Sequence, residues 1–244
     1  MKLILDRWQG LGDNLQVSTI PRRYFEKYGE KCVWVSDANK YNSEEVRSLV
    51  WESNPYIAGF TDEPGTNITH KLKYRQKSWI ETWERAYDLL EPYNHRPELF
   101  VNLPSPQFNV SERVLIDISF SVSSYKKNIC EYKTGDAMRK VLLDLYSQSP
   151  DPFITVTNNK ILYNNNAFVN FLNDLVPEIK TETLEVNNIL EYAQYLKACR
   201  RFICTHSGCH ALGSAVGSET LCLIPKHYYD LRYFVFDNVQ YISI

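Results

Sequence analysis

The sequence predicts an α/β protein of two Rossmann-like lobes, each built on a parallel sheet, with a cleft between them at the carboxyl ends of the strands. Three observations predict this architecture. Short apolar runs alternate with amphipathic helical segments along the chain. Both halves show the same β-α-β-α order. A proline-rich stretch from Pro92 to Ser111 separates them, so we expect one lobe at residues 1–107 and the other at 108–244.

The first half begins with an apolar run at residues 2–6, which predicts a buried strand. A glycine-containing turn leads into a helix from about Asn14 to Tyr28, which we expect Pro21 to kink. The further expected elements are a strand at 31–36, a helix at 43–52 capped by Ser43, a strand at 56–60 and a helix at 78–91 with the apolar stripe Trp79, Trp83, Ala86 and Leu90.

The second half repeats this alternation of strands and helices. We expect strands at 113–119, 152–157, 183–186, 201–205 and 220–225 and in the tail, and helices at 135–148, 164–175, 187–199 and 206–217. The strand–helix–strand order favours parallel pairing, because each helix returns the chain to the same edge of the sheet.

Composition excludes several classes of protein. The 244 residues are 44% hydrophobic and 23% charged with a net charge of -2, which is ordinary globular usage without the basic excess of a sequence-independent nucleic-acid binder. The longest apolar runs are too short for a membrane-spanning helix or a signal-peptide core, so we expect a cytoplasmic protein of a bacterium or of a virus-infected host. The six cysteines form no CxxC pair and are expected to be free thiols.

The first candidate site is the turn Gly10-Leu11-Gly12-Asp13. Its glycines allow a sharp turn and close approach to a ligand, and the helix start that follows attracts anionic or polar groups. Asp13 is therefore either a general base facing the cleft or the N-cap of the helix, and both interpretations stay open. A dinucleotide fingerprint would need glycine at position 15, where Leu15 stands, and a methyltransferase loop remains an alternative.

The second candidate site follows the strand at 201–205. Hydroxyl, backbone N–H and imidazole groups at a helix N-terminus are suited to gripping a diphosphate, and this turn supplies Thr205, His206, Ser207, Gly208 and His210. Cys204 and Cys209 alternate with the histidines, but zinc sites use paired ligands at separated positions, so we expect no metal. A hydrogen-bonded packing role for the histidines stays open.

A third candidate is the polar loop after the strand at 113–119. It contains Lys126 and Lys127 on the cleft side of the expected sheet. One lysine could neutralise a phosphate there, and at least one of the pair is expected to be solvated surface.

Two segments carry a resemblance to a known family. The strand followed by GLGDNLQVSTIP resembles the opening of the family 9, heptosyltransferase-type glycosyltransferases, with counterparts at Gly12-Asp13, Leu15, Thr19 and Pro21. The segment ILEYAQYLKACRRFICTHSGCHALGSAVGSETLCLIP is similar to that family's helix, strand, [DN]-[ST]-G-x-x-H-x-A-A-A-x-G and strand. Its matches are Ser207-Gly208, Ala215 and Gly217. His206 stands where the family has an acidic residue, and Ala211 where it has a histidine.

The resemblance implies a GT-B fold and an inverting, metal-independent transfer from a nucleotide-sugar donor, with no other cofactor. It also implies that the lobe at 1–107 is the acceptor side and that the lobe at 108–244 binds the nucleotide sugar. Asp13 would be the general base. The donor would be bound by Gly10, Gly12, Lys126, Lys127, Thr205, His206, Ser207, Gly208 and His210. The implied acceptor is a saccharide or glycolipid, with a hydroxymethylated base of phage DNA as an alternative. A sugar-nucleotide epimerase or hydrolase of the same fold, and a degenerate non-catalytic nucleotide-binding protein, also stay open.

Overall fold

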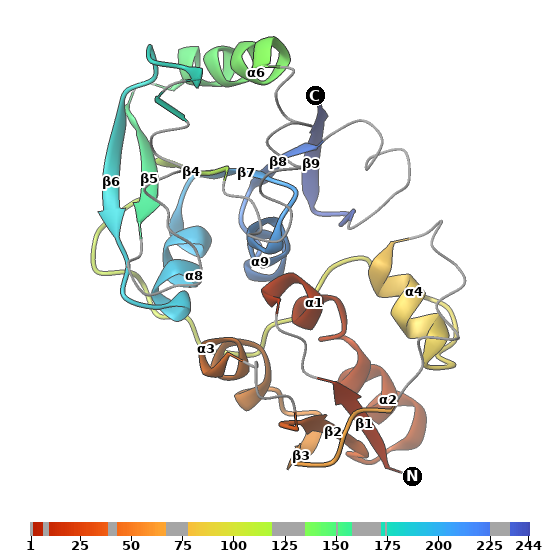
Figure 1. Ribbon diagram of the computed structural model, residues 1–244. Helices are drawn as coiled ribbons and strands as arrows, with labels where there is room; N and C mark the ends of the chain where they lie inside the picture. The colour runs from red at the N-terminus through yellow and green to blue at the C-terminus, as the bar shows by residue number, and fades with distance from the viewer. Residues whose placement is uncertain are drawn as a thin grey trace. The chain divides into compact units, whose positions relative to one another are not determined.

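The computed structural model describes residues 2–6, 10–38, 43–66, 78–118, 135–149, 151–157, 172–173, 175–224 and 235–244. The chain divides into two compact α/β units (Figure 1). Unit 1 comprises Met1–Asn102 with Leu231–Asp237, and unit 2 comprises Leu103–Asp230 with Asn238–Ile244. The later segment of unit 1 is joined to the earlier one by a hydrogen bond of 3.2 Å from the Asp237 N–H to the His95 carbonyl. No helix in the described ranges is long and apolar enough to cross a membrane.

Unit 1 is built on a three-stranded parallel sheet in the order β1-β2-β3. Its strands are β1 (Leu3–Asp6), β2 (Val33–Ser36) and β3 (Ile57–Thr61). The helices are α1 (Leu11–Gln16), α2 (Ile20–Tyr28), α3 (Glu44–Val46), the π-helix η1 (Arg47–Glu52) and α4 (Trp79–Ala86). The expected β-α-β unit at the N-terminus is confirmed, because β1 and β2 pair directly in parallel and the helices between them in the chain connect the two strands.

The prediction of a single helix from Asn14 to Tyr28 is wrong. Two helices, α1 and α2, occupy this segment, and a turn at residues 17–19 separates them. Pro21 is the second residue of α2, where the N–H that proline lacks would have no partner within the helix. Pro21 therefore starts a new helix and does not kink an existing one.

Two further helices differ from expectation. Ser43 caps its helix as expected and accepts a hydrogen bond of 3.4 Å from Val46 N–H, but the segment changes from α- to π-helix at Arg47. The helix expected to reach Glu91 ends at Ala86, because Asp88 has a left-handed backbone with φ of 57°. Leu90 lies outside the helix and is 75% exposed, so it does not belong to the apolar stripe.

Unit 2 is built on a six-stranded parallel sheet in the order β6-β5-β4-β7-β8-β9. Its strands are β4 (Val114–Asp117), β5 (Phe153–Thr157), β6 (Thr181–Glu185), β7 (Arg201–Thr205), β8 (Thr220–Ile224) and β9 (Val239–Ser243). Counted from β4, this is the doubly wound order 3-2-1-4-5-6, in which the winding direction reverses between β4 and β7. Ligands of such sheets bind outside the carboxyl ends of the strands at this reversal.

Three described helices cover the sheet of unit 2. They are α6 (Gly135–Ser147), α8 (Ile189–Ala198) and α9 (Gly208–Val216). Figure 1 shows α6 on one face and α8 and α9 on the other. The hydrophobic core under α6 contains Val114, Ile116, Met138, Leu142, Phe153, Ile203, Leu221 and Leu223. Since strand side chains alternate between faces, the residues between them face α8 and α9.

The strands for which the sequence predicted bounds are confirmed to within two residues at each end, and the tail contains β9. The helices expected at 135–148, 187–199 and 206–217 are also confirmed as α6, α8 and α9. Most of the helix expected at 164–175 lies outside the described residues. Asn188 begins α8 by accepting a hydrogen bond of 2.9 Å from Glu191 N–H, and Gly217 ends α9 in a left-handed conformation.

Gly213 allows α9 to approach the sheet closely. A β-carbon at this position would lie 2.4 Å from Thr220 Oγ1 and 3.0 Å from Phe202 Cδ1. Both distances are shorter than van der Waals contact, and both neighbours belong to strands that α9 covers. The close packing of α9 on β7 and β8 therefore depends on the missing side chain at this position.

We expect Gly213→Ala to lower the free energy of unfolding by roughly 1–3 kcal/mol, because the added methyl overpacks the interface with Thr220 and Phe202. The sign of this change is informative, because Gly→Ala in an unobstructed helix raises the free energy of unfolding by up to about 1 kcal/mol. Urea denaturation measures the change. In a double-mutant cycle with Thr220→Ala, removing the obstructing side chain should recover part of the loss. A more stable Gly213→Ala protein would contradict the packing described here.

Candidate functional site

The first candidate site lies in unit 1, where the chain leaves β1 and enters α1. Gly10 is the N-cap of α1, with an extended backbone at φ -81° and ψ 138°. Asp13 lies in the first turn of the helix, three residues after the cap. The interpretation of Asp13 as the N-cap is therefore wrong. An aspartate in the first turn is nevertheless favoured there, because its negative charge faces the positive end of the helix dipole.

The Asp13 carboxyl group folds back toward Gly10. A β-carbon on Gly10 would lie 2.5 Å from Asp13 Oδ2, so only glycine leaves room for this side-chain position. The side chain is exposed on its outer side, and the protein around the rest of the carboxyl desolvates it. This desolvation raises the pKa of Asp13 above the ordinary value of 3.8. The turn thus presents an accessible carboxylate of increased basicity.

Asn14 holds this turn from the interior of unit 1. Its Nδ2 donates to the Gly10 carbonyl at 2.9 Å, and its Oδ1 accepts from Trp51 Nε1 at 2.9 Å. The side chains of Asn14 and Trp51 are fully buried, so water does not compete for the hydrogen bond between them. Sequence reasoning missed Asn14, because the pairing with Trp51 joins positions 37 residues apart and leaves no local pattern.

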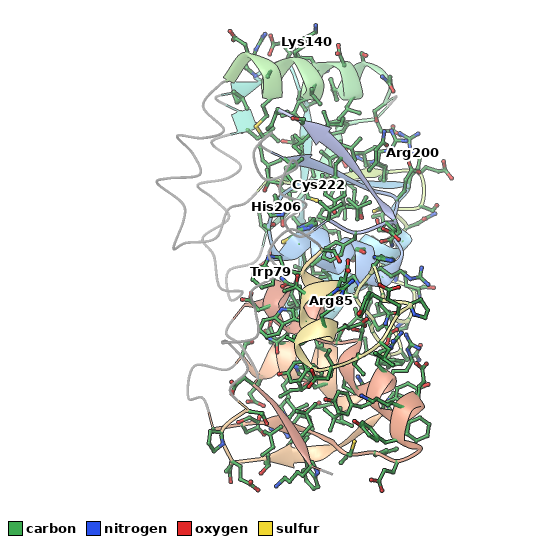
Figure 2. All side chains as sticks on the ribbon, turned by 90° about the vertical axis from the view of Figure 1, so that its right-hand side faces the viewer. Trp79, Arg85, Lys140, Arg200, His206 and Cys222 are labelled. Atoms are coloured by element: carbon green, nitrogen blue, oxygen red, sulfur yellow. The ribbon has the colours of Figure 1, made fainter. Side chains whose placement is uncertain are left out.

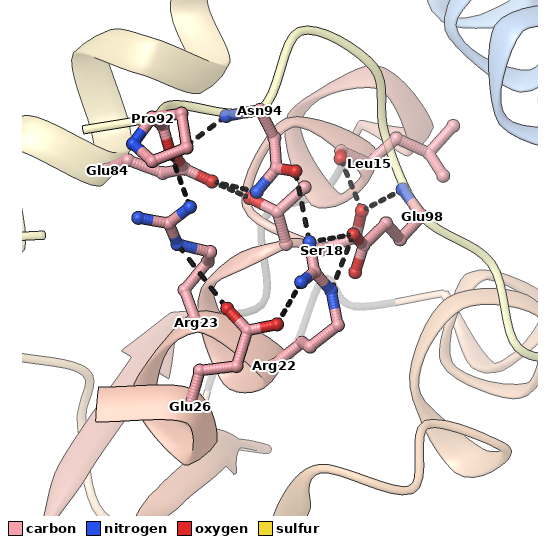
Figure 3. A network of polar contacts seen from close by, with 10 residues as sticks. Leu15, Ser18, Arg22, Arg23, Glu26, Glu84, Pro92, Asn94 and Glu98 are labelled. Atoms are coloured by element: carbon pink, nitrogen blue, oxygen red, sulfur yellow. Dashed lines mark hydrogen bonds and ion pairs between the residues drawn. The ribbon is translucent and has the colours of Figure 1, made fainter. Parts of the chain in front are cut away.

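The end of α1 is held by a second set of polar contacts, shown in Figure 3. Ser18 Oγ donates to the Leu15 carbonyl at 2.7 Å and accepts from Glu98 N–H at 2.8 Å. The Glu98 carboxylate is bound in turn by the Arg22 guanidinium, whose Nε lies 2.8 Å from Oε1. These contacts tie the turn between α1 and α2 to the segment around residue 98.

Glu84 of α4 is the buried centre of the same network. It accepts from Thr19 Oγ1 at 2.7 Å, from Asn94 Nδ2 at 2.7 Å and from Asn94 N–H at 3.0 Å. Its side chain is fully buried, so these donors replace the water that a carboxylate would otherwise bind. Thr19, a position of the family pattern, therefore has a structural partner inside unit 1.

The second candidate site lies in unit 2, at the turn from β7 into α9. Ser207 is the N-cap, and its hydroxyl accepts from Cys209 N–H at 3.3 Å. The His210 ring nitrogen Nδ1 contacts the Ser207 carbonyl, which can only accept, so Nδ1 carries the proton. The His206 ring stacks on the His210 ring with centroids 4.8 Å apart. Thr205 and Gly208 complete the turn on either side.

The turn thus brings together all five residues expected there, but they differ in exposure. Thr205 and His210 are buried, whereas His206, Ser207 and Gly208 are half-buried. Figure 2 labels His206, which belongs to this turn, and Cys222, which belongs to the neighbouring strand β8. The buried His210 imidazole supports the turn through Ser207, and its direct contact with a donor stays a prediction.

Asp117 adds a carboxylate that sequence reasoning missed. It ends β4 on the opposite side of the sheet reversal from β7 and is buried. Its Oδ2 accepts from Tyr192 O–H at 2.7 Å and from Cys209 S–H at 3.3 Å. The available signal was a lone acidic residue at the carboxyl end of an apolar strand, the position where parallel sheets bind ligands.

Three further expectations concern the lysine pair, a metal ion and the cysteines. Lys126 and Lys127 lie outside the described residues. Among the residues that the structure describes, no group of three or more His, Cys, Asp or Glu side chains is arranged to hold a metal ion. The cysteines at 32, 199, 204, 209 and 222 are free thiols, as expected.

We expect Glu84→Gln to lower the free energy of unfolding by about 1–3 kcal/mol, because glutamine offers one acceptor oxygen and turns its N–H groups toward donors. Chemical denaturation measures the change. Glu91→Gln is the control: it removes an ion pair of a 73% exposed carboxylate and should change stability by less than about 0.5 kcal/mol. Equal effects of the two substitutions would contradict the role given to the buried network.

No protein-family description matches the chain, and no curated protein is similar in sequence. Solved structures do match. The bacterial iron-containing dodecameric glycosyltransferase TibC from enterotoxigenic E. coli H10407 is 13% identical, with a TM-score of 0.62. The alignment covers 100% of this chain and 64% of TibC, so the chain spans less than two thirds of that protein.

This chain covers a larger share of two further solved structures. A family 9 glycosyl transferase from Veillonella parvula is 9% identical with a TM-score of 0.60, covering 100% of this chain and 86% of that one. The E. coli heptosyltransferase WaaC, solved with ADP, is 10% identical with a TM-score of 0.58, covering 100% and 93%. At these identities the likeness establishes the fold. The chain therefore has the GT-B type α/β fold of the heptosyltransferase-like glycosyltransferases, with a parallel sheet in each of its two units.

Proposed function

We propose that this protein is a glycosyltransferase that moves a sugar from a nucleotide-sugar donor to an acceptor hydroxyl, with Asp13 as the general base. One observation carries the proposal. The chain follows the fold of solved glycosyltransferases over its whole length and carries an accessible carboxylate in the first turn after β1. This is the position of the aspartate in the family pattern that the sequence resembles.

The chemistry requires a base. As the acceptor oxygen attacks the anomeric carbon, its proton must leave, and a carboxylate within hydrogen-bond reach accepts it. The raised pKa of Asp13 makes its ionised form a stronger base than an ordinary aspartate. A single displacement from the face opposite the nucleotide needs one base and no covalent intermediate, so the proposed outcome is inversion at the anomeric carbon.

The proposed donor site is the turn into α9. Backbone N–H groups at the start of a helix, together with the helix dipole, favour the charge of a diphosphate. The half-buried Ser207 and Gly208 lie at this helix start, and His206 adds an imidazole beside them. Because WaaC was solved with ADP, ADP is the first probe for this turn. The acceptor class stays as inferred from the resemblance, a saccharide or glycolipid, with a modified DNA base as the alternative.

A non-catalytic nucleotide-binding protein is the second candidate. It is favoured by His206 and Ala211, which replace the acidic residue and the histidine of the family pattern. Both candidates bind a nucleoside diphosphate, and only the first releases one during turnover on an acceptor. Conversion of a sugar nucleotide without any acceptor would instead favour the epimerase or hydrolase.

We expect Asp13→Asn to lower the rate constant kcat by about 10²–10⁴-fold, the usual contribution of a positioned general base. Affinity for ADP, measured by calorimetry, should change less than about threefold, because Asp13 acts on the acceptor. Asp136→Asn is the matched control, since this exposed aspartate also lies in the first turn of a helix, α6. Turnover that survives in Asp13→Asn removes Asp13 from its role.

The pH dependence of kcat/KM should show an acidic limb set by Asp13. Its ionised form is active, so activity is present above the pKa and is lost as the pH falls through it. Because desolvation raises this pKa, the midpoint should lie above 3.8. Initial rates across the acidic range measure the limb, with protein integrity checked at each pH. The residual activity of Asp13→Asn should lack it, and a limb that persists there belongs to another group.

A further inference from the structure

The carboxylate of Asp117 joins three elements at the start of α9. Asp117 ends β4, Tyr192 belongs to α8, and Cys209 is the second residue of α9. Both Tyr192 O–H and Cys209 S–H donate to the same oxygen, Oδ2, at 2.7 Å and 3.3 Å. Asp117 and Tyr192 are buried. A buried carboxylate is stable only when donors replace its water, so this position selects neutral, protonated partners.

The place of Cys209 makes its protonation state important. A cysteine in the first turn of a helix normally has a lowered pKa, because the positive end of the helix dipole favours the thiolate. A thiolate there would put a negative charge where the proposed function binds a diphosphate. Two anionic groups in one helix start repel each other, so an ionised Cys209 would oppose donor binding.

The described groups around Cys209 oppose its ionisation. Burial and then the Asp117 carboxylate hold the pKa of Cys209 well above that of an ordinary thiol. Burial likewise holds the pKa of Tyr192 well above its usual range. Cys204 of β7 also interacts with Cys209, and burial holds the pKa of Cys204 well above that of an ordinary thiol. The imidazoles of His206 and His210, which stack on each other, belong to the same turn and are its neighbours along the chain.

We propose that Asp117 is a positioning residue of the donor site: by accepting the S–H of Cys209, it fixes the start of α9 and keeps this thiol a neutral hydrogen-bond donor. The proposal rests on the proposed function for the identity of the anion that α9 binds. It assigns roles to Asp117, Tyr192 and Cys209 that the family pattern does not contain.

The first test needs no substrate. Alkylation by iodoacetamide, resolved by peptide mass spectrometry, reports the thiolate fraction of each cysteine from about pH 6 to about pH 10. Asp117→Asn should lower the midpoint for Cys209 by about one unit or more, which raises its labelling rate at neutral pH about tenfold. The buried Cys204 and Cys222 are internal references and should stay unlabelled. An unchanged midpoint for Cys209, or labelling of all three cysteines together, overturns the proposal.

A second variant separates charge from loosened packing. Tyr192→Phe removes one donor from Asp117 and leaves the hydrogen bond from Cys209 S–H in place. The midpoint for Cys209 should then stay the same or rise, in contrast to Asp117→Asn. A lower midpoint in both variants would mean that any damage to the cluster exposes the thiol, and the assignment to Asp117 would fail.

The link to the donor site is tested with ADP by calorimetry. In Asp117→Asn, affinity for ADP should fall as the pH rises through the new midpoint of Cys209, while the wild-type affinity stays level over the same range. Asp117→Asn/Cys209→Ser should restore the level profile, because a serine hydroxyl does not ionise there. A level profile in Asp117→Asn overturns the positioning role. Absence of ADP binding to the wild type contradicts the proposed donor, whereas the alkylation results still decide the state of Cys209.

Discussion

The parallel pairing of β4 with β7 is the contact on which the candidate donor site depends. Asp117 and Cys204 are paired residues at the carboxyl ends of these strands, and Thr205 continues β7 directly into the turn. The winding direction of the sheet reverses at this pair, which is where sheets of this type bind their ligands. The turn into α9 and the buried carboxylate of Asp117 are neighbours for this reason alone, although 87 or more residues separate them along the chain.

Close packing then fixes the direction of α9. Gly213 allows the helix to lie against Thr220 and Phe202. The next residue, Ser214, donates through its Oγ to Asn238 Oδ1 at 2.5 Å. The N-terminal end of the helix is held by Ser207 and by Asp117 through Cys209. A helix fixed at both ends presents its first N–H groups in a constant direction, which is what a preorganised anion site requires.

Unit 1 uses a different device for its candidate base. Buried polar side chains hold the turn that carries Asp13. Asn14 donates a hydrogen bond to the Gly10 carbonyl, while Glu84 and Ser18 take part in hydrogen bonds at the other end of α1. Such groups stabilise only when all their hydrogen bonds are made, because each unpaired partner would remain buried without water. This requirement fixes the turn in one conformation. Apart from its favourable interaction with the helix dipole, the exposed Asp13 carboxyl group is not needed to hold the turn.

The sequence by itself determined the alternation of strands and helices, the parallel sheets and the two turns with their small and polar residues. These features have short periods or short spacings, and local chemistry enforces them. It did not determine that Pro21 begins a helix, that Asp88 ends α4, or that Asn14, Glu84 and Asp117 have buried polar partners. Those outcomes depend on side chains brought together from distant positions, such as Trp51 for Asn14 and Tyr192 for Asp117. Only the tertiary structure could decide them, because the free energy of a buried polar group is set by its neighbours in space and not by its neighbours in the chain.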